Sequence, residues 1–486
     1  MNTEIYIAFL AYFSILLAIG LISYKKQTSE ADFIMGSRSL NFWLTALSAH
    51  ASDMSSWLFM GFPAAIFVAG LSQSWIAVGL LLGMFMNWQF VATKLRIATE
   101  KNNSYTLSSF FESHFADKSG TLRILTATIT VFFLTCYLSA GLIAIGRLLE
   151  SVFGIDYYFG LTVAASVVML YTFIGGFITV AWTDLFQAIF LLFMIMLVPA
   201  MAFSTIDGGW ESIQAAASAQ EISLSFIPDT SPASIMTIIF LVFGWGLGYF
   251  GQPHIVTKFM GIKDAKDLHK SKYFGISWEI LALTAATAIG LVGMSYFKNG
   301  LANPELVFIE MVKSLFHPFA AGFILCGVLA ASMSTMDSQI LVCASIFSED
   351  FYKHAIHKKA SSKELLRVSR AGVIGISLLS LFIAFNKNAT VLEAVQYAWS
   401  GLGASFGPLV LMALYSSKAN KYGAIAGIVT GGVIAGTWDL VNPWIIDYAI
   451  PSMLPAFFLS LLMIYVVSVL SGRKAEGEIQ KAEVRI

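Results

Sequence analysis

Long apolar stretches separated by short polar connections run along almost the whole chain. A helix needs about 20 apolar residues to cross a bilayer, and most of these stretches approach or exceed that length. We therefore predict an all-α polytopic membrane protein with about thirteen transmembrane helices. The predicted spans are residues 5–24, 42–70, 73–93, 124–150, 158–180, 184–205, 233–252, 274–296, 319–347, 371–386, 390–415, 422–440 and 450–471.

Two of these spans contain residues that do not suit a regular membrane helix. Span 2 carries the run Ala-Ser-Asp-Met-Ser-Ser-Trp at residues 51–57, which places Asp53 at bilayer depth. A carboxylate at that depth costs at least about 2.5–3.5 kcal/mol. At the end of span 7, residues 243–253 contain four glycines and a proline. We predict that both spans are broken helices, whose unwound backbone offers carbonyl oxygens to a cation.

A pair of broken spans that lie five spans apart indicates two inverted repeats around a central binding site. We expect the first repeat at residues 42–205 and the second at residues 206–415. Residues 1–41, with the first span, and residues 416–471, with spans 12 and 13, would flank these repeats. A short polar tail, residues 472–486, is expected to be cytoplasmic.

Composition narrows the class of protein. The chain is 57% hydrophobic and only 12% charged, whereas soluble domains are about 25% charged. Its net charge is zero, which gives no electrostatic footprint for nucleic acid. We find no metal-ligand spacing, nucleophile–base arrangement or phosphate-binding loop, and we expect a protein that is not an enzyme. No feature of the sequence points to an obligate protein partner.

The basic residues predict the orientation in the membrane. If the N-terminus lies outside, all but four of the 29 Lys and Arg residues fall on the inner side, the four being Arg147, Lys298, Lys313 and Lys387. This bias follows the positive-inside rule. We expect a multi-pass protein of the plasma (inner) membrane with a cytoplasmic C-terminus. The basic cluster that begins at Lys258 would form a cytoplasmic face attracted to anionic lipid of the bilayer.

Span 9 supplies hydroxyl groups that would complete a cation site at the break in span 2. The run of polar residues from Ser332 to Gln339 is unusual inside a membrane span, although serines also let helices pack closely. For Asp53, the alternative to sodium binding is a structural role, in which its carboxylate accepts hydrogen bonds from backbone N–H groups in the break. The predicted sodium-binding residues are Ala51, Asp53, Met54, Ala331, Ser334 and Thr335.

Other acidic residues lie near this predicted site. Asp337 follows Ser334 by three residues and would share its helix face. Together with Asp184 and Ser338 it would form a second cation site or an exit path for the ion. For Asp184, at the inner end of span 6, the alternative is a helix cap. Glu279 lies near the inner interface, where a structural role is expected.

Aromatic residues gather at the two breaks and predict the substrate pocket. Trp245 and Tyr249 are one helical turn apart in span 7, Trp57 follows the break in span 2, and Tyr137 lies in a polar patch of span 4. Aromatic rings beside loosened backbone make an apolar pocket with polar rims, which suits a small zwitterion. The alternative for each ring is packing or an interfacial belt.

At these residues the chain resembles the sodium/solute symporter family, and within it the carriers of proline. The likeness is carried by residues 38–40, 45–49, 51–55, 171–177, 244–254, 333–335 and 338–343, and it runs in order from about residue 32 to residue 411. It implies a LeuT-type fold of 5+5 inverted repeats within thirteen spans, with broken helices 2 and 7.

The resemblance also implies roles for individual residues. Sodium would be the coupling ion, held by the ligands named above with Asp53 as the essential acid. Arg38 would be a functional charge at the inner end of span 2, and Asp184 would be tied to sodium transit. The implied substrate-binding residues are Ser55, Ser56, Trp57, Tyr137, Trp245, Tyr249 and Pro253.

Two positions depart from the pattern of the family's proline carriers. Ser56 stands where these carriers usually have glycine, and His50 replaces a small residue just before the break. The function that we predict is sodium-coupled import of L-proline by alternating access. The alternatives are a sodium-coupled symporter of another small amino acid, an organic acid or a pantothenate-like solute, and a membrane sensor that binds proline without transporting it.

Overall fold

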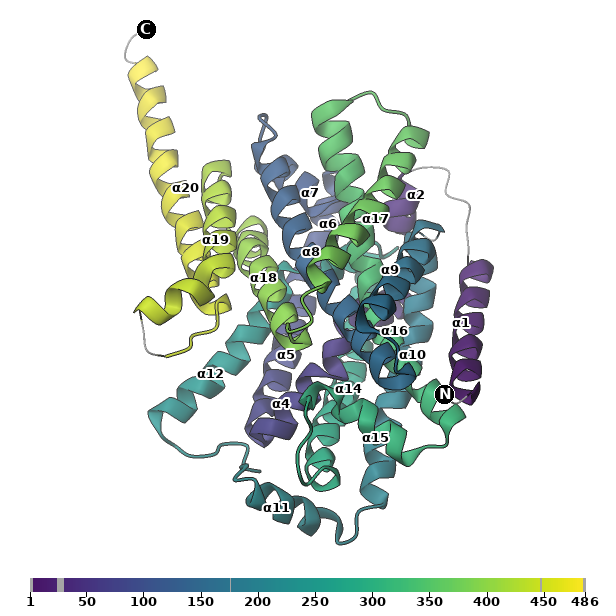
Figure 1. Cartoon of the computed structure of the whole chain (residues 1–486). Coiled ribbons are helices and arrows are strands. Elements are labelled where there is room, and N and C mark those ends of the chain that lie inside the picture. Colours follow the sequence, from purple (N-terminus) through teal and green to yellow (C-terminus); the bar gives the residue numbers. More distant parts are fainter. Residues whose placement is uncertain (1–2, 24–29, 175, 446–447, 484–486) are drawn as a thin grey trace.

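The structure is a computed structural model that describes residues 3–23, 30–174, 176–445 and 448–483 (Figure 1). These residues form helices and their connections, with one isolated bridge between Leu40 and Ile262. The helices at the predicted spans are α1 (Thr3–Ser23), α3 (Phe42–Asp53), α4 (Gly61–Ala69), α5 (Trp75–Met86), α8 (Thr121–Phe153), α9 (Tyr157–Ile174), α10 (Phe177–Ser204), α12 (Pro232–Gly246), α14 (Leu268–Tyr296), α16 (Pro318–Ser345), α17 (Ser362–Ala384), α18 (Val391–Tyr415), α19 (Lys421–Ile445) and α20 (Met453–Glu483).

Among the described residues, eleven helices are long and apolar enough to cross a membrane. Shorter apolar helices, Ser56–Ala69 and Tyr157–Leu170, coincide with parts of the predicted spans 2 and 5. The remaining elements are α2 (Glu30–Met35), η1 (Gly36–Arg38), η2 (Ser56–Leu58), η3 (Leu71–Ser74), η4 (Asn87–Ala92), α6 (Thr93–Lys101), α7 (Leu107–His114), α11 (Gly209–Ala219), η5 (Leu247–Gly251), α13 (Pro253–Met260), η6 (Ala265–Asp267), η7 (Pro304–Leu306), α15 (Val307–Leu315) and η8 (Ile346–Ile356).

Spans 5 and 6 meet earlier in the chain than predicted. Helix α9 ends at Ile174 and α10 begins at Phe177, with Gly176 between them at φ +119°, a conformation that only glycine adopts readily. The apolar pattern continues across this turn because the first residues of α10 are themselves buried. Asp184 consequently lies in the third turn of α10, so its interpretation as a helix cap is wrong.

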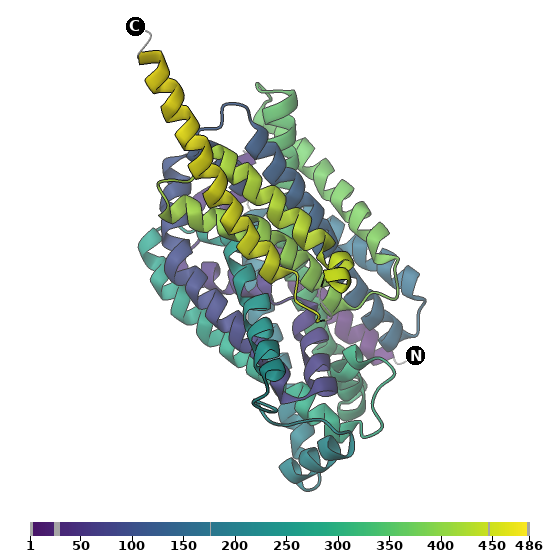
Figure 2. The same cartoon turned by 90° about the vertical axis from the view of Figure 1, so that its left-hand side faces the viewer.

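The spans outside the predicted repeats lie at the periphery of the bundle. Helix α1 packs against α16 and α10, and α19 and α20 pack against α18. In Figure 1, α1 and α20 lie on opposite flanks, and Figure 2 shows α19 and α20 crossing the face of the bundle. Helix α16 lies at the centre and is largely buried, as are the polar residues of its second half.

Helix α3 is short and enclosed by protein. It contacts α10, α13, α14 and α16, and every residue from Leu44 to Asp53 is buried. Its polar side chains therefore face other helices, where partners exist, rather than lipid, where an unpaired polar group is costly. This enclosure makes α3 the natural place for a polar binding site inside a membrane protein.

The connections between spans separate to the two ends of the bundle. Helices α11 and α15, from the connections predicted to lie outside, are at the lower end in Figure 1. Helix α7, from a connection predicted to lie inside, is at the opposite end. This separation of the connections agrees with spans that cross the membrane in alternating directions, which is the basis of the predicted topology.

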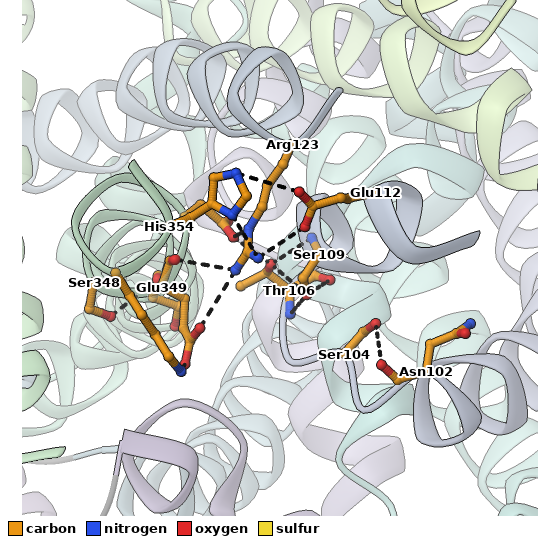
Figure 3. A network of polar contacts seen from close by, with 12 residues as sticks. Asn102, Ser104, Thr106, Ser109, Glu112, Arg123, Ser348, Glu349 and His354 are labelled. Atoms are coloured by element: carbon orange, nitrogen blue, oxygen red, sulfur yellow. Dashed lines mark hydrogen bonds and ion pairs between the residues drawn. The ribbon is translucent and has the colours of Figure 1, made fainter. Parts of the chain in front are cut away.

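A polar network ties the connection that carries α7 to the bundle (Figure 3). Arg123 of α8 donates from Nε to Asp350 Oδ1 (2.6 Å) and from Nη1 to Glu112 Oε2 (3.1 Å). Its Nη2 lies 3.5 Å from Glu349 Oε2. One guanidinium thus joins α8 to α7 and to η8, and it compensates three carboxylates that are mostly shielded from solvent.

Replacing Arg123 by glutamine should destabilise the fold. Removing one partner of a buried ion pair costs about 3–5 kcal/mol when the charges left behind are not compensated. Arg123→Gln should therefore lower the midpoint of thermal unfolding in detergent, whereas substitution of the exposed Lys118 by glutamine should not. Equal unfolding midpoints for the two variants would contradict a stabilising role of this network.

Candidate functional site

Helix α3 stops in the middle of the predicted span 2. Its first turn is capped by Asn41, whose Oδ1 accepts from Leu44 N (3.0 Å), and its last helical residue is Asp53. Met54 then has φ −80° and ψ 76°, and a short 3₁₀ turn, η2, leads into α4. Met54 is outside the α-helical ladder, which makes its carbonyl oxygen available to a ligand, whereas the carbonyls of Ser55 and Ser56 accept from N–H groups of the following turn.

Span 7 is interrupted in a comparable way. Helix α12 ends at Gly246 and is followed by the 3₁₀ segment η5, after which Gln252 is extended with φ −82° and ψ 106°. Pro253 then begins α13. Gly248 is needed here because an added Cβ would collide with the indole of Trp399.

Four of the predicted sodium ligands come together between α3 and α16. Ser334 Oγ lies 2.8 Å from Ala51 O and 3.2 Å from Ala331 O. Thr335 Oγ1 lies 3.3 Å from Ala51 O and 3.2 Å from Ala331 O. Met54, the remaining predicted backbone ligand, follows α3 directly and lies in the break.

The composition of this cluster fits an alkali cation. Its members are neutral oxygens, at most 1% exposed, and Ala330 O also lies 2.9 Å from Ser334 Oγ. Both hydroxyls reach Ala51 O, which lies in the last turn of α3, where carbonyl oxygens have no further helical N–H donor. Oxygen-rich clusters of this kind suit hard cations, and rotation of the two hydroxyls would expose their lone pairs to the ion.

The side chain of Asp53 is directed elsewhere. Its Oδ2 accepts from Tyr249 Oη at 2.5 Å, and its Oδ1 has no hydrogen-bond partner within the described part of the chain. Its backbone oxygen accepts from Trp57 Nε1 at 3.3 Å. Asp53 therefore connects the break in α3 to the break in span 7, and its carboxylate is not hydrogen-bonded to the Ser334 cluster.

Two residues near Asp53 lie elsewhere than predicted. Glu279 was assigned to the inner interface, yet it is fully buried, and its Oε1 lies 3.2 Å from Tyr249 Oη. His50 Nδ1 lies 3.6 Å from Glu279 Oε2, so His50 faces α14 rather than the predicted pocket. The sequence did hold one signal for Glu279. It lies two turns beyond Lys272 and therefore deeper in span 8 than the membrane interface.

The predicted substrate residues are all buried around the two breaks. The rings of Trp57 and Trp245 lie 5.9 Å apart, and Tyr249 meets Trp399 edge-on at 5.0 Å. Trp399, which sequence analysis missed, donates from Nε1 to Trp245 O at 2.8 Å. Span 11 gave no signal for it because a tryptophan in an apolar span usually packs or lies in an interfacial belt.

Several polar atoms in this region lack partners among the described residues. They are Ser55 Oγ, Ser56 Oγ, Tyr137 Oη and Asp53 Oδ1. Buried polar atoms are nearly always hydrogen-bonded, so a group of them marks a place where a ligand or water is accommodated. Pro253 begins α13 directly after the break, and the ring of His254 meets that of Tyr137 edge-on at 5.6 Å.

The two predicted inner acids have different hydrogen-bond partners. Asp184 Oδ2 accepts from Ser48 Oγ (2.6 Å) and from Lys258 Nζ (3.0 Å). Asp337 Oδ1 instead accepts from Thr172 Oγ1 on α9 at 2.7 Å. The assignment of Lys258 to a lipid-facing surface is therefore wrong, because the α13 helix turns it inward.

Ser338 links the inner acids to a cavity. Its Oγ lies 2.8 Å from Ser52 Oγ on α3, one turn beyond Ser48. The residues that line the cavity include Pro253, His254, Lys258 and Ser338 together with residues 105–108. It therefore lies between residues that follow the break in span 7 and the connection that carries α7.

Arg38 lies outside this group. It occupies η1 before α3 and donates from Nη2 to Thr99 O and Ser104 O, both at 3.1 Å. Arg38 thus fastens the segment that leads into α3 to the end of α6.

Comparison with known proteins identifies relatives of this chain. A family model described as the sodium:solute symporter family matches residues 33–431. The high-affinity proline transporter PutP of Bacillus subtilis is 40% identical over 466 residues, which are 95% of this chain and 97% of that protein. The sodium/proline symporter of Salmonella typhimurium is 41% identical over 477 residues, which are 96% of this chain and 93% of that protein.

Solved structures share the architecture. A Na+-coupled sialic acid symporter, in its substrate-bound outward-open state, matches with a TM-score of 0.82 and 18% identity, covering 96% of this chain and 98% of that one. MhsT in complex with L-phenylalanine matches with a TM-score of 0.57 and 14% identity, covering 92% and 99%. At such identities the likeness shows the fold alone, and it confirms the predicted all-α, LeuT-type architecture.

The family model and the full-length relatives agree with each other. They confirm that the chain is a membrane transporter rather than an enzyme and that sodium is its coupling ion. The chain belongs to the sodium:solute symporter family.

Proposed function

We propose that this protein imports L-proline across the plasma membrane together with sodium, by alternating access. Family membership supports this assignment, as do the relatives that match over nearly their whole length and are named as proline carriers. The observation that carries it is the cluster formed by Ala51, Ala331, Ser334 and Thr335, because these neutral oxygens suit a dehydrated sodium ion. Met54 completes the proposed ligand set.

The unpartnered polar atoms around the breaks match the two charges of a zwitterion. The Ser55 and Ser56 hydroxyls would donate to the proline carboxylate, and Asp53 Oδ1 would accept from its ammonium. The rings of Trp57, Tyr137, Trp245 and Tyr249 would enclose the apolar pyrrolidine, with Pro253 at the inner edge. Ser56 adds a hydroxyl to this site where the family's proline carriers usually have glycine.

Sodium and proline would be coupled through the backbone of the break. Met54, a proposed sodium ligand, directly precedes Ser55 and Ser56, so an ion that orders the carbonyls also orders the substrate hydroxyls. The coupling must be reciprocal, since each ligand changes the affinity of the other by the same factor.

The inner cavity gives the route by which ligands would leave. Ser338 lines it and lies one turn beyond Ser334, so a released ion would meet this hydroxyl on the way inward. We place Asp184, Asp337 and Ser338 along that route rather than at the primary sodium site. Arg38 would hold the inner end of α3 while the route opens.

Orientation and driving force complete the proposal. The N-terminus would lie outside and the C-terminus in the cytoplasm, as the positions of the basic residues predict. One sodium ion moved through 100 mV supplies about 2.3 kcal/mol, and a tenfold sodium gradient adds about 1.4 kcal/mol. Together they support accumulation of roughly several hundredfold.

A panel of labelled solutes tests the substrate assignment. The purified protein, in liposomes with an inward sodium gradient, should take up L-proline, and unlabelled proline should compete with far lower concentrations than other amino acids, organic acids or pantothenate. Preferential uptake of one of those solutes would overturn the assignment to proline. Saturable proline binding without uptake would instead identify a sensor.

A further inference from the structure

Lys258 is a buried charge inside the bundle. It lies in α13, is 1% exposed, and its Nζ is 3.0 Å from Asp184 Oδ2. Phe177 covers the ammonium from the other side, with its ring centroid 5.1 Å from Nζ. Removing an ammonium and a carboxylate from water costs several kcal/mol per ion, and their attraction repays this only with good geometry.

The pair has a further hydrogen bond but is not fully satisfied. Ser48 Oγ donates to the same Asp184 oxygen at 2.6 Å. Asp184 Oδ1 and Asp337 Oδ2 have no hydrogen-bond partner among the described residues, and both side chains are completely buried. Two buried carboxylates thus stand near one ammonium, in a region that attracts cations.

This region adjoins the proposed sodium site. Ser48 and Ser52 are one turn apart on α3, and Ser52 Oγ lies 2.8 Å from Ser338 Oγ. Ser338 is in turn four residues beyond Ser334 on α16. Ser52 Oγ also donates to Ser48 O, and Ser48 Oγ donates to Asp184, so α3 carries hydroxyl groups from the turn that contacts α16 to the carboxylate that Lys258 neutralises.

The surroundings offer the same kinds of ligand that a second ion would need. Asp184, Asp337 and Ser338 are the residues in which the sequence indicated a second cation site. The ammonium of Lys258 already contributes a positive charge at this place, and its stem is anchored in α13. Coulomb repulsion between two cations this close in a poorly solvated site strongly disfavours a sodium ion beside it.

We propose that Lys258 is a tethered cation that takes the place of a second sodium ion at Asp184, and that it thereby limits coupling to one sodium per substrate. The inference rests on the proposed sodium-coupled transport and specifies its ion stoichiometry. Lys258 also lines the inner cavity, so its charge stands where an ion arriving from the cytoplasm would meet Asp184.

The experiment compares Lys258→Gln with the wild type. Equilibrium binding of radioactive sodium to the purified full-length protein should rise from one ion per chain to two, because the neutral side chain leaves Asp184 uncompensated. In liposomes, the charge moved per proline should double, and the dependence of uptake on sodium concentration should become sigmoidal. Lys258→Arg, which retains the charge, should behave as the wild type.

A double variant supplies the matched control. Asp184→Asn with Lys258→Gln removes both charges, keeps two side chains of similar size, and should bind one sodium ion again. One bound ion and an unchanged charge ratio in a folded Lys258→Gln protein would overturn the inference. If the Lys258→Gln variant is absent from the membrane, sodium binding to the wild type still tests the inference. Two bound sodium ions per wild-type chain would contradict the role of Lys258 as a tethered cation.

These outcomes are separable from failure of the proposed function. A wild type that takes up no proline under a sodium gradient would refute transport itself. A wild type that transports proline with two charges per molecule would leave transport intact and refute only the role of Lys258.

Discussion

Replacing Asp53 by asparagine is expected to lower sodium-dependent proline uptake by about a hundredfold or more. The carboxylate accepts the Tyr249 hydroxyl at 2.5 Å and leaves its second oxygen for the substrate ammonium. A hydrogen bond to a charged group contributes about 1.5–3 kcal/mol, and asparagine loses the charge toward both partners. Initial rates of labelled proline uptake, normalised to protein in the membrane, measure the effect.

A surface acid supplies the control for this variant. Asp229 lies in an exposed connection between α11 and α12, so Asp229→Asn should retain normal uptake. The Asp53→Asn protein must reach the membrane in comparable amount for the comparison to count. Undiminished uptake by this variant would remove Asp53 from the transport site.

Removing the two hydroxyls of the oxygen cluster is expected to weaken sodium binding. Ser334→Ala combined with Thr335→Ala deletes two of the five proposed ligands and removes the hydroxyl donors from Ala51 O and Ala331 O. At about 1.4 kcal/mol for each lost ligand, the sodium concentration for half-maximal uptake should rise about a hundredfold. Uptake measured over a wide sodium range at fixed proline tests this.

Ser332 provides a matched control on the same helix. It is equally buried, but its hydroxyl donates to Val328 O of its own helix at 2.8 Å. Ser332→Ala should therefore leave the sodium dependence unchanged. If the double variant altered proline affinity at saturating sodium while its sodium dependence stayed normal, the assignment of Ser334 and Thr335 would be wrong.

The sequence was sufficient to predict the membrane fold and the centre of the site. Apolar runs of bilayer length give the spans, and Asp53 among serines marks the end of α3, because local rules govern both features. The polar run in α16 likewise identified Ser334 and Thr335, which the structure places against Ala51. The roles of these residues in binding remain predictions.

Local sequence patterns could not predict which residues pair with the buried charges of Asp184 and Lys258. Asp184 meets Ser48 and Lys258 only because α10, α3 and α13 pack together, and those residues are far apart in the chain. The turn at Gly176 was missed because apolar residues flank it on both sides in the sequence, so the apolar pattern is not interrupted. Lys258 was placed among neighbouring basic residues of the next connection, although it lies within α13, one turn beyond the buried His254.

Ion specificity of accumulation tests the central claim most directly. Sealed liposomes containing the purified protein would be given an inward sodium gradient and an inside-negative potential, and internal labelled proline would be followed until it is steady. We expect accumulation well above the external concentration with sodium outside and only equilibration when choline replaces it. Equal accumulation with choline at every external pH would contradict sodium-coupled transport.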